Sequence, residues 1–207
     1  MTTTHTPAPA RSDVTSSATT PRRGTHPFRK HGLMLAAGAV SWSAAIALLG
    51  TEPSHDQPAP LIFGLTSGAF QIGLLCLLRV LWRTQGLGTG RLARFLLRLE
   101  TGLVSLAICS TIVDAIGVSD LDQAGWLMLD MFWPISMLGM FFIGIRIAIA
   151  GRWKGVTRFW PMVAESWAVV TVPTLNIFGT GAAQVVGSLH LLVGYTVLGV
   201  LVSRTES

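Results

Sequence analysis

The chain has 207 residues, of which 50% are hydrophobic and only 12% are charged, and its mean hydropathy is +0.56. A soluble domain of this length needs about 25% charged residues to cover its surface, so the composition excludes an ordinary soluble globular protein. The sequence instead predicts an integral membrane protein whose exterior is largely covered by lipid.

The N-terminal segment differs in composition from the rest of the chain. Residues 1–27 are rich in Thr, Ser, Pro and Ala and show no apolar period. Such a segment cannot bury enough apolar surface to offset the entropy lost on ordering. We therefore expect residues 1–30 to be a disordered cytoplasmic tail, residues 31–203 to form the transmembrane domain, and residues 204–207 to be a short cytoplasmic end.

Six apolar stretches follow, each near the length of about 20 residues that spans a hydrocarbon core of about 30 Å. In chain order they are Leu33 to Gly50, Leu61 to Trp82, Phe95 to Val118, Gly125 to Ala150, Phe159 to Ile177 and Ala182 to Val202. The last two are separated only by residues 179–181, which read Gly-Thr-Gly and indicate a tight turn. The pattern predicts an all-α bundle of six transmembrane helices, with five spans as the alternative count.

The basic residues predict how this bundle is oriented. With six spans, all 15 Lys and Arg residues fall on one side, whereas the first and third connections carry Glu52, Asp56, Asp120 and Asp122. Lys and Arg accumulate in short cytoplasmic loops, so both termini are expected to be cytoplasmic, in the plasma membrane. The net charge of +5 then reflects this topology and an attraction to anionic lipid headgroups, and no nucleic-acid binding is expected.

Polar side chains inside the spans are the candidate functional residues, because an ionisable group in lipid is costly unless it faces protein, water or a partner. Helical projection aligns Glu100 with Asp114 on the third span and Glu165 with Asn176 on the fifth, and we expect both lines to face the bundle interior. The candidate polar track consists of Glu100, Thr111, Asp114, Asp130, Glu165, Asn176 and His190.

Each of these positions also has a purely structural interpretation. Glu100 and Glu165 could form anchoring ion pairs with nearby arginines. Asp114 and Asp130 lie at matching depth, where they could hold a shared proton or a cation, or be solvated by headgroup water. His190 could bond a hydroxyl group or a kinked backbone carbonyl, or act as a proton relay or ligand contact. Small residues four apart, such as Gly64 and Gly68, indicate helix packing.

Known cofactor sites do not fit the sequence. A haem held by two histidines needs paired intramembrane histidines, yet His190 is the only one within a span. No His, Cys and carboxylate grouping has the spacing of a zinc site, and the glycines of residues 86–90 lack the features of a phosphate-binding loop. We therefore predict no catalytic residue, no cofactor and no metal.

An intramembrane enzyme is a third alternative, and it depends on a resemblance. Ser136 in the fourth span and His190 in the sixth resemble the arrangement of rhomboid intramembrane serine proteases, which implies a serine nucleophile and a histidine base. The family's Gly-x-Ser-x motif is here Pro-Ile-Ser-Met at residues 134–137, and a glycine follows His190 only at Gly194. These departures remove the motif on which the protease chemistry depends.

A second resemblance concerns the class alone. The run from Asp130 to Met140, Asp-x-x-Trp-Pro-x-Ser-Met-x-Gly-Met, is similar to runs in uncharacterised small multipass membrane proteins of bacteria, and it implies no activity. The sequence favours a non-enzymatic helical bundle that acts as a subunit, sensor or regulator, as a homo-oligomer or with another membrane protein. The alternative is a transporter of a small solute, or one coupled to a proton or cation, that uses the polar track.

Overall fold

The computed structural model describes residues 1–2, 26–51, 58–118 and 123–205, and all regular structure in these residues is helical. The expected N-terminal tail falls largely on residues 3–25, which lie outside the described residues, as do residues 206–207. The four acidic residues expected in the first and third connections also lie outside them, within residues 52–57 and 119–122.

The described helices join into six successive rods, because three rods consist of consecutive helical segments. The segments are α1 (Arg29–Leu49), α2 (Ala59–Thr84), α3 (Arg91–Ala115), α4 (Ala124–Asp130), α5 (Phe132–Ala150), α6 (Val156–Glu165), α7 (Trp167–Phe178), α8 (Thr180–His190), the π-helical η1 (Leu191–Tyr195) and α9 (Thr196–Ser203). Five rods are long and apolar enough to cross a membrane: α1, α2, α3, α4 with α5, and α8 to α9. The chain is therefore a multipass membrane protein of helical class.

The fifth apolar stretch differs from the single helix expected. It consists of α6, with 10 residues, and α7, with 12 residues, which are separated at Ser166. The hydroxyl of Ser166 donates to the carbonyl oxygen of Val163 at 2.8 Å, and its backbone N–H donates to the same oxygen at 3.3 Å. The backbone of Ser166, with ψ of 4°, departs from the helical value, and each of the two helices also contains a proline, Pro161 or Pro173, which removes a backbone donor. The rod is therefore interrupted at Ser166.

The tight turn expected between the last two stretches is confirmed. Helix α7 ends at Phe178, α8 begins at Thr180, and Gly179 between them has φ of +82°. This left-handed region of backbone space favours glycine, which has no Cβ to clash with the chain.

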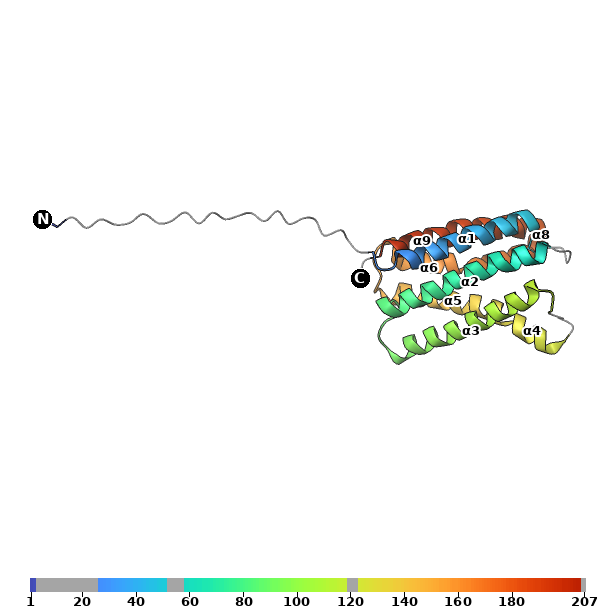
Figure 1. Ribbon diagram of the computed structural model, residues 1–207, viewed down its shortest axis with the longest axis horizontal. Coiled ribbons are helices and arrows are strands. Elements are labelled where there is room, and N and C mark those ends of the chain that lie inside the picture. The colour runs from blue at the N-terminus through green and yellow to red at the C-terminus, as the bar shows by residue number, and fades with distance from the viewer. Residues whose placement is uncertain (3–25, 52–57, 119–122, 206–207) are drawn as a thin grey trace.

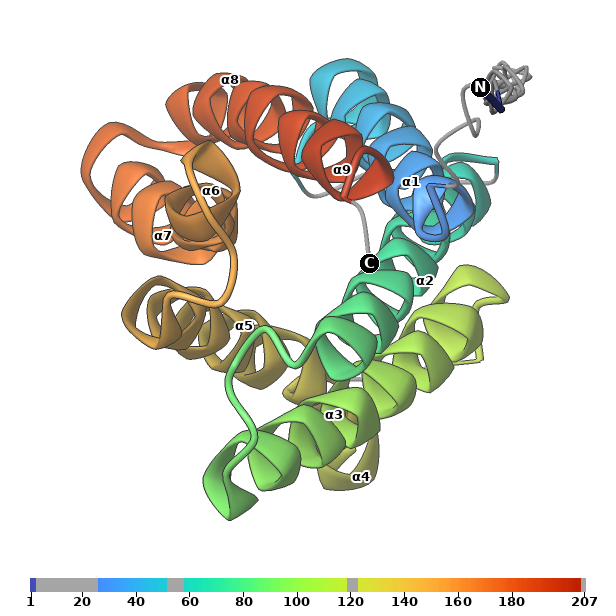
Figure 2. The same cartoon turned by 90° about the vertical axis from the view of Figure 1, so that its left-hand side faces the viewer.

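The six rods are arranged as a ring when the bundle is viewed along its length (Figure 2). Helix α1 packs between α2 and α9, α2 packs on α3, α3 on α5, and α5 on α6, while α7 packs on α8 and so completes the ring. Helix α1 begins and α9 ends at the same end of the bundle (Figure 1), where Gly32 lies against Gly199 and Ser203.

Small residues allow several of these helices to approach closely. A methyl group placed on Gly38 would lie 2.7 Å from the Cα atom of Phe70, and one on Gly199 would lie 2.7 Å from the backbone nitrogen of Ala36. A methyl group on Gly64 would overlap Cβ of Ala115 in α3. The interpretation of Gly64 as a helix-packing position is thus confirmed. The α1–α2 and α1–α9 contacts also depend on a glycine that lets the two backbones approach closely.

Aromatic side chains fill much of the space inside the ring. The ring of Trp42 lies 5.0 Å from that of Phe70, 5.5 Å from that of Trp133 and 5.6 Å from that of Trp167. Trp42 and Phe70 are almost fully buried. These contacts bring together α1, α2, α5 and α7, and they form one wall around the polar groups described next.

Candidate buried carboxyl site

Glu100 reaches the interior from the middle of α3. Its side chain is only 3% exposed and lies on the same buried face as Leu97, Val104 and Ala107. On the facing helix α5, a methyl group at Gly139 would overlap Oε2 of Glu100. The absence of a side chain at Gly139 therefore leaves the room that the carboxyl group of Glu100 fills.

Glu165 is the last residue of α6, directly before the bend, and it is 1% exposed. Its Oε2 accepts a hydrogen bond of 2.7 Å from the hydroxyl group of Tyr195. Tyr195 ends the π-helical segment η1 and is fully buried, with its ring 4.7 Å from that of Phe70 in an edge-to-face arrangement. The hydrogen bond therefore joins two rods at places where each departs from regular α-helix.

Glu100 and Glu165 are close enough for their charges to interact. Each of the two charges also interacts electrostatically with the Tyr195 hydroxyl group. We call these three residues the carboxyl site. Oε1 of each glutamate is buried and has no hydrogen-bond partner among the described residues. The carboxyl site thus brings together two acids that are far apart in the sequence, and it leaves a buried oxygen of each without a protein donor.

The anchoring ion pairs considered for these glutamates do not form in the described part of the chain. Arg98 lies over the ring of Trp82, with its guanidinium carbon 5.6 Å from the ring centroid. Arg158 lies over Phe159 at 5.0 Å and donates through Nε to the carbonyl oxygen of Ala148 at 2.7 Å. Both arginines, although near in sequence to the acids, therefore contact other groups.

The chemistry available at the carboxyl site follows from these contacts. Two buried carboxylates without a cation would each carry a desolvation cost and would repel each other. A proton held by the pair, or a small cation between the carboxylates, would remove most of that repulsion. The Tyr195 hydroxyl donates to one oxygen of Glu165 and so fixes which oxygens remain free to accept.

His190 lies beside the carboxyl site and holds the end of α6. Its Nε2 is 3.0 Å from the carbonyl oxygen of Val163 and 3.2 Å from that of Ala164. A methyl group on Gly194 would lie 3.2 Å from Cα of Ala164, so glycine permits this close approach. The geometry is that of the structural alternative, a histidine bonded to the carbonyls of a bent helix.

The other members of the polar track lie apart from the carboxyl site. Thr111 accepts a hydrogen bond of 2.8 Å from Nε2 of Gln71 on α2. Asp114 and Asp130 are both exposed, lie close enough for their charges to interact, and Asp130 accepts a hydrogen bond from Ser110. The expectation that the line through Glu100 and Asp114 faces the interior is thus wrong at Asp114. The track is divided between an inner group and a group where α3 ends and α4 begins.

The expectation that the line through Glu165 and Asn176 faces the interior is wrong beyond the bend. Val169 is 47% exposed and Val172 is 51% exposed, and Asn176 is exposed and donates to the carbonyl oxygen of Val172 in its own helix at 2.8 Å. The change of direction at Ser166 turns this face of α7 outward, which a straight helical projection could not anticipate.

The described residues do not have the geometry of a serine protease. The hydroxyl of Ser136 is buried and donates to the carbonyl oxygen of Trp133 at 3.0 Å, while Nε2 of His190 contacts the carbonyls of α6. A serine nucleophile requires a hydrogen bond to its base, and these two side chains bond other groups. Within the same residues, no three His, Cys, Asp or Glu side chains are grouped so as to hold a metal ion.

Sequence reasoning missed Tyr195, which completes the carboxyl site, and Gln71, which bonds Thr111. Tyr195 is the single tyrosine of the chain, and a buried phenol in an apolar span requires a partner. That requirement could have pointed to Tyr195.

Comparison of the chain with models of protein families, with curated proteins and with solved structures found no match.

Proposed function

We propose that this protein is a non-enzymatic sensor or regulator of the plasma membrane that binds a proton or small cation at the carboxyl site. In this proposal the chain crosses the membrane six times, with both termini in the cytoplasm. It acts through helix contacts, either with another copy or with another membrane protein. The observation that carries the proposal is the burial of Glu100 and Glu165 together, without a cation among the described residues.

Electrostatics supports the binding of a positive charge here. Removing a carboxylate from water has an effective cost of several kcal/mol, and a second carboxylate nearby adds repulsion. Stability alone would be served as well by apolar residues of similar size. A pair of acids at this depth is therefore better explained by a bound proton or cation than by packing.

Binding at the carboxyl site can change how the surrounding helices pack. Glu165 precedes the bend at Ser166, and Tyr195 ends η1, so the hydrogen bond between them crosses two helix irregularities. Loss or gain of charge on Glu165 changes how strongly it accepts from Tyr195. Occupation of the carboxyl site is thereby coupled to the packing of α6 and α7 against η1.

Six crossings are supported by the arrangement of basic residues together with the combined length of α6 and α7. The two helices contain 22 helical residues in sequence with one residue between them, which is enough to cross a core of about 30 Å. With six crossings, all the Lys and Arg residues fall on one side, as short cytoplasmic loops favour.

A transporter coupled to a proton or cation is the second candidate. It is favoured by the interruption of two rods beside the carboxyl site, since transporters commonly form ion sites where helices are discontinuous. It differs from a sensor in one respect: the bound charge must leave on the other side of the membrane.

Infrared difference spectroscopy tests the proposal directly. The full chain in proteoliposomes is titrated with acid, and the absorption of protonated carboxyl groups is followed. We expect a component that Glu100→Gln and Glu165→Gln each remove and that Asp130→Asn, at the opposite end, leaves in place. If both glutamine variants titrate like the unmodified chain, and if Na⁺ and K⁺ displace no proton, the proposal is wrong.

Flux measurements on the same proteoliposomes separate the two candidates. A pH-sensitive dye inside the vesicles reports proton entry driven by an imposed gradient. A sensor shows the infrared signal without flux, whereas a transporter shows both, and Glu100→Gln abolishes both.

A further inference from the structure

A cavity of about 570 Å³ lies at the basic end of the bundle, away from the carboxyl site. Its walls come from residues before α1, the end of α2, the connection between α5 and α6, and the end of α9. The cavity is thus formed where four parts of the ring meet, beside the start of α1 and the end of α9.

Four cationic side chains line this cavity: Arg83, Arg152, Lys154 and Arg204. All four are exposed, and the wall contains no acidic residue among those described. Within the described part of the chain, none of the four forms a hydrogen bond or ion pair through its side chain, whereas Arg98 and Arg158 at the same end contact aromatic rings. Among the described residues, the positive charge of the cavity therefore has no counter-charge.

Helix dipoles act on this charge from several sides. Arg83 lies in the last turn of α2 and Arg204 directly follows α9, where the partial negative charge of a helix C-terminus favours a cation. Arg152 and Lys154 lie in the connection between the C-terminus of α5, which also favours a cation, and the N-terminus of α6, which favours an anion. An anion in the cavity would be attracted both by these cations and by the start of α6.

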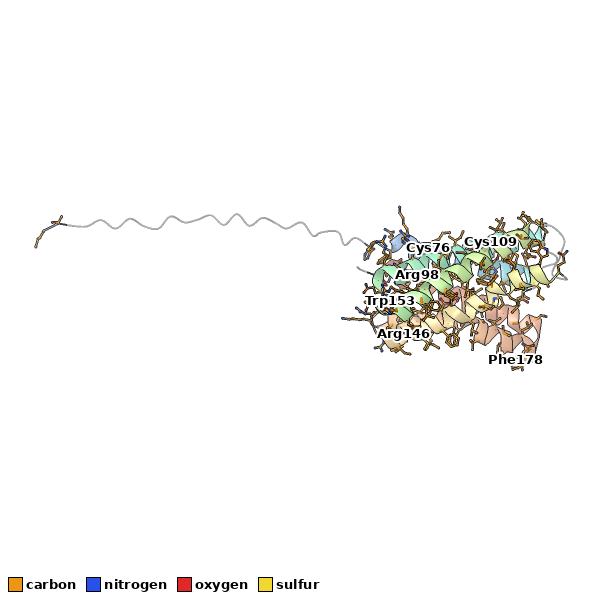
Figure 3. The ribbon with its side chains drawn as sticks, turned by 90° about the horizontal axis from the view of Figure 1, so that it is seen from below. Cys76, Arg98, Cys109, Arg146, Trp153 and Phe178 are labelled. Carbon is orange, nitrogen blue, oxygen red and sulfur yellow. The ribbon has the colours of Figure 1, made fainter. Side chains whose placement is uncertain are left out.

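Apolar residues form part of the cavity wall. Trp153 is 6% exposed, and its Nε1 donates to Oγ1 of Thr84 at 3.1 Å, which ties the α5–α6 connection to the end of α2. Figure 3 shows Trp153 at this end of the bundle, together with Arg98 and Arg146, while Phe178 lies at the other end. Phe28 and Leu201 add apolar surface, and Thr157 adds a hydroxyl group from the first turn of α6.

We propose that this cavity binds the phosphate group of a ligand that also has an apolar part. Several cations together with hydroxyl groups match the acceptor oxygens of a phosphate, and the α6 N-terminus adds to the attraction. The ligand is either an anionic phospholipid, whose headgroup enters from the membrane surface, or a free phosphate compound from the aqueous phase. This binding is independent of the carboxyl site.

Two probes distinguish these sources, both applied to the full chain in a neutral detergent. Inorganic pyrophosphate is titrated and binding heat is measured. In parallel, phosphatidylglycerol or phosphatidylcholine is added and the retained lipid is counted by native mass spectrometry. A response to pyrophosphate identifies a free phosphate compound, and selective retention of phosphatidylglycerol without that response identifies a lipid headgroup.

Matched variants locate the binding. We expect Arg83→Gln with Arg204→Gln to weaken binding by about tenfold or more, and Lys154→Gln alone by about threefold. The control, Arg91→Gln with Arg94→Gln, removes the same charge from exposed residues of the same end that do not line the cavity. If the double variant fails to fold, Lys154→Gln on the exposed connection carries the test.

The proposal is overturned if the unmodified chain binds neither pyrophosphate nor phosphatidylglycerol in preference to phosphatidylcholine. It is also overturned if the control loses as much affinity as the cavity variants, since the attraction would then belong to the whole basic end. Loss confined to the cavity variants supports it.

Discussion

The hydroxyl oxygen of Tyr195 lies 2.7 Å from Oε2 of Glu165, and this contact joins the π-helical segment of the last rod to the bend in the rod before it. Both side chains are almost fully buried. A π-helical segment widens the helix by one residue and is frequent at functional positions. Here it coincides with the residue that donates to the carboxyl site, which motivates the first prediction.

Tyr195→Phe removes the donor and leaves Oε2 of Glu165 without its partner. We expect a loss of about 0.5–2 kcal/mol in unfolding free energy, the range for a hydrogen bond inside a membrane protein. Unfolding in mixed micelles measures it. In the Glu165→Gln background the same substitution should cost less, because a neutral acceptor bonds the phenol more weakly; equal costs in both backgrounds would mean that a charge on Glu165 does not strengthen the bond.

His190 should carry its hydrogen on Nε2, because the two atoms within hydrogen-bond distance of that nitrogen are carbonyl oxygens, of Val163 and Ala164. Nitrogen NMR of histidine-labelled protein observes this directly. His190→Leu should lower the unfolding free energy by about 1–2 kcal/mol, while His190→Gln, which keeps an N–H donor, should lose less. An Nε2 without hydrogen would contradict the assigned role.

The contact of α1 with α9 should be intolerant of any side chain at Gly199. A methyl group there would lie 2.7 Å from the backbone nitrogen of Ala36 and 2.8 Å from its Cβ, so Gly199→Ala must separate the two helices, at a cost of about 1–3 kcal/mol. The matched control is Gly102→Ala in α3, which has open space around it. The control should be neutral or stabilising by up to about 1 kcal/mol, because alanine favours helix more than glycine. Similar losses for both would argue against the close approach.

The number of crossings can be decided at the two ends of the α6–α7 rod. In a chain without its two free cysteines, Cys76 and Cys109, single cysteines are introduced as Val156→Cys, Thr180→Cys and, as a cytoplasmic reference, Thr89→Cys. Six crossings predict that a membrane-impermeant thiol reagent applied to intact cells reacts only at position 180. Reaction at positions 156 and 180 from the same side would reduce the count to five.

Helical class and the positions of the apolar rods could be predicted because lipid imposes length and polarity on each span. The turn at Gly179 could be predicted because glycine flanks it in a stretch otherwise too long for one helix. The bend at Ser166 could not, since serine is common in straight spans and other hydroxyl groups of this chain, such as those of Thr101 and Ser136, bond carbonyls within unbroken helices.

The carboxyl site was accessible to sequence reasoning only in part. The periodicity of the sequence correctly predicted that Glu100 faces the interior, because α3 is one continuous helix with one buried face. That Glu100 and Glu165 face the same interior, and that Gly139 leaves room for Glu100, depends on the order of helices around the ring, which hydrophobic patterning does not specify. The basic cavity depends in the same way on which connections lie side by side.

The direct contact between α1 and α9 also has a consequence for biosynthesis. The face of α1 that carries Gly32 and Ala36 acquires its neighbour only when the last helix of the described chain has left the ribosome. Until then the nascent bundle is an open arc in which α1 contacts α2 but leaves this face uncovered, so any chaperone or lipid that shields the face acts before α9 is in place.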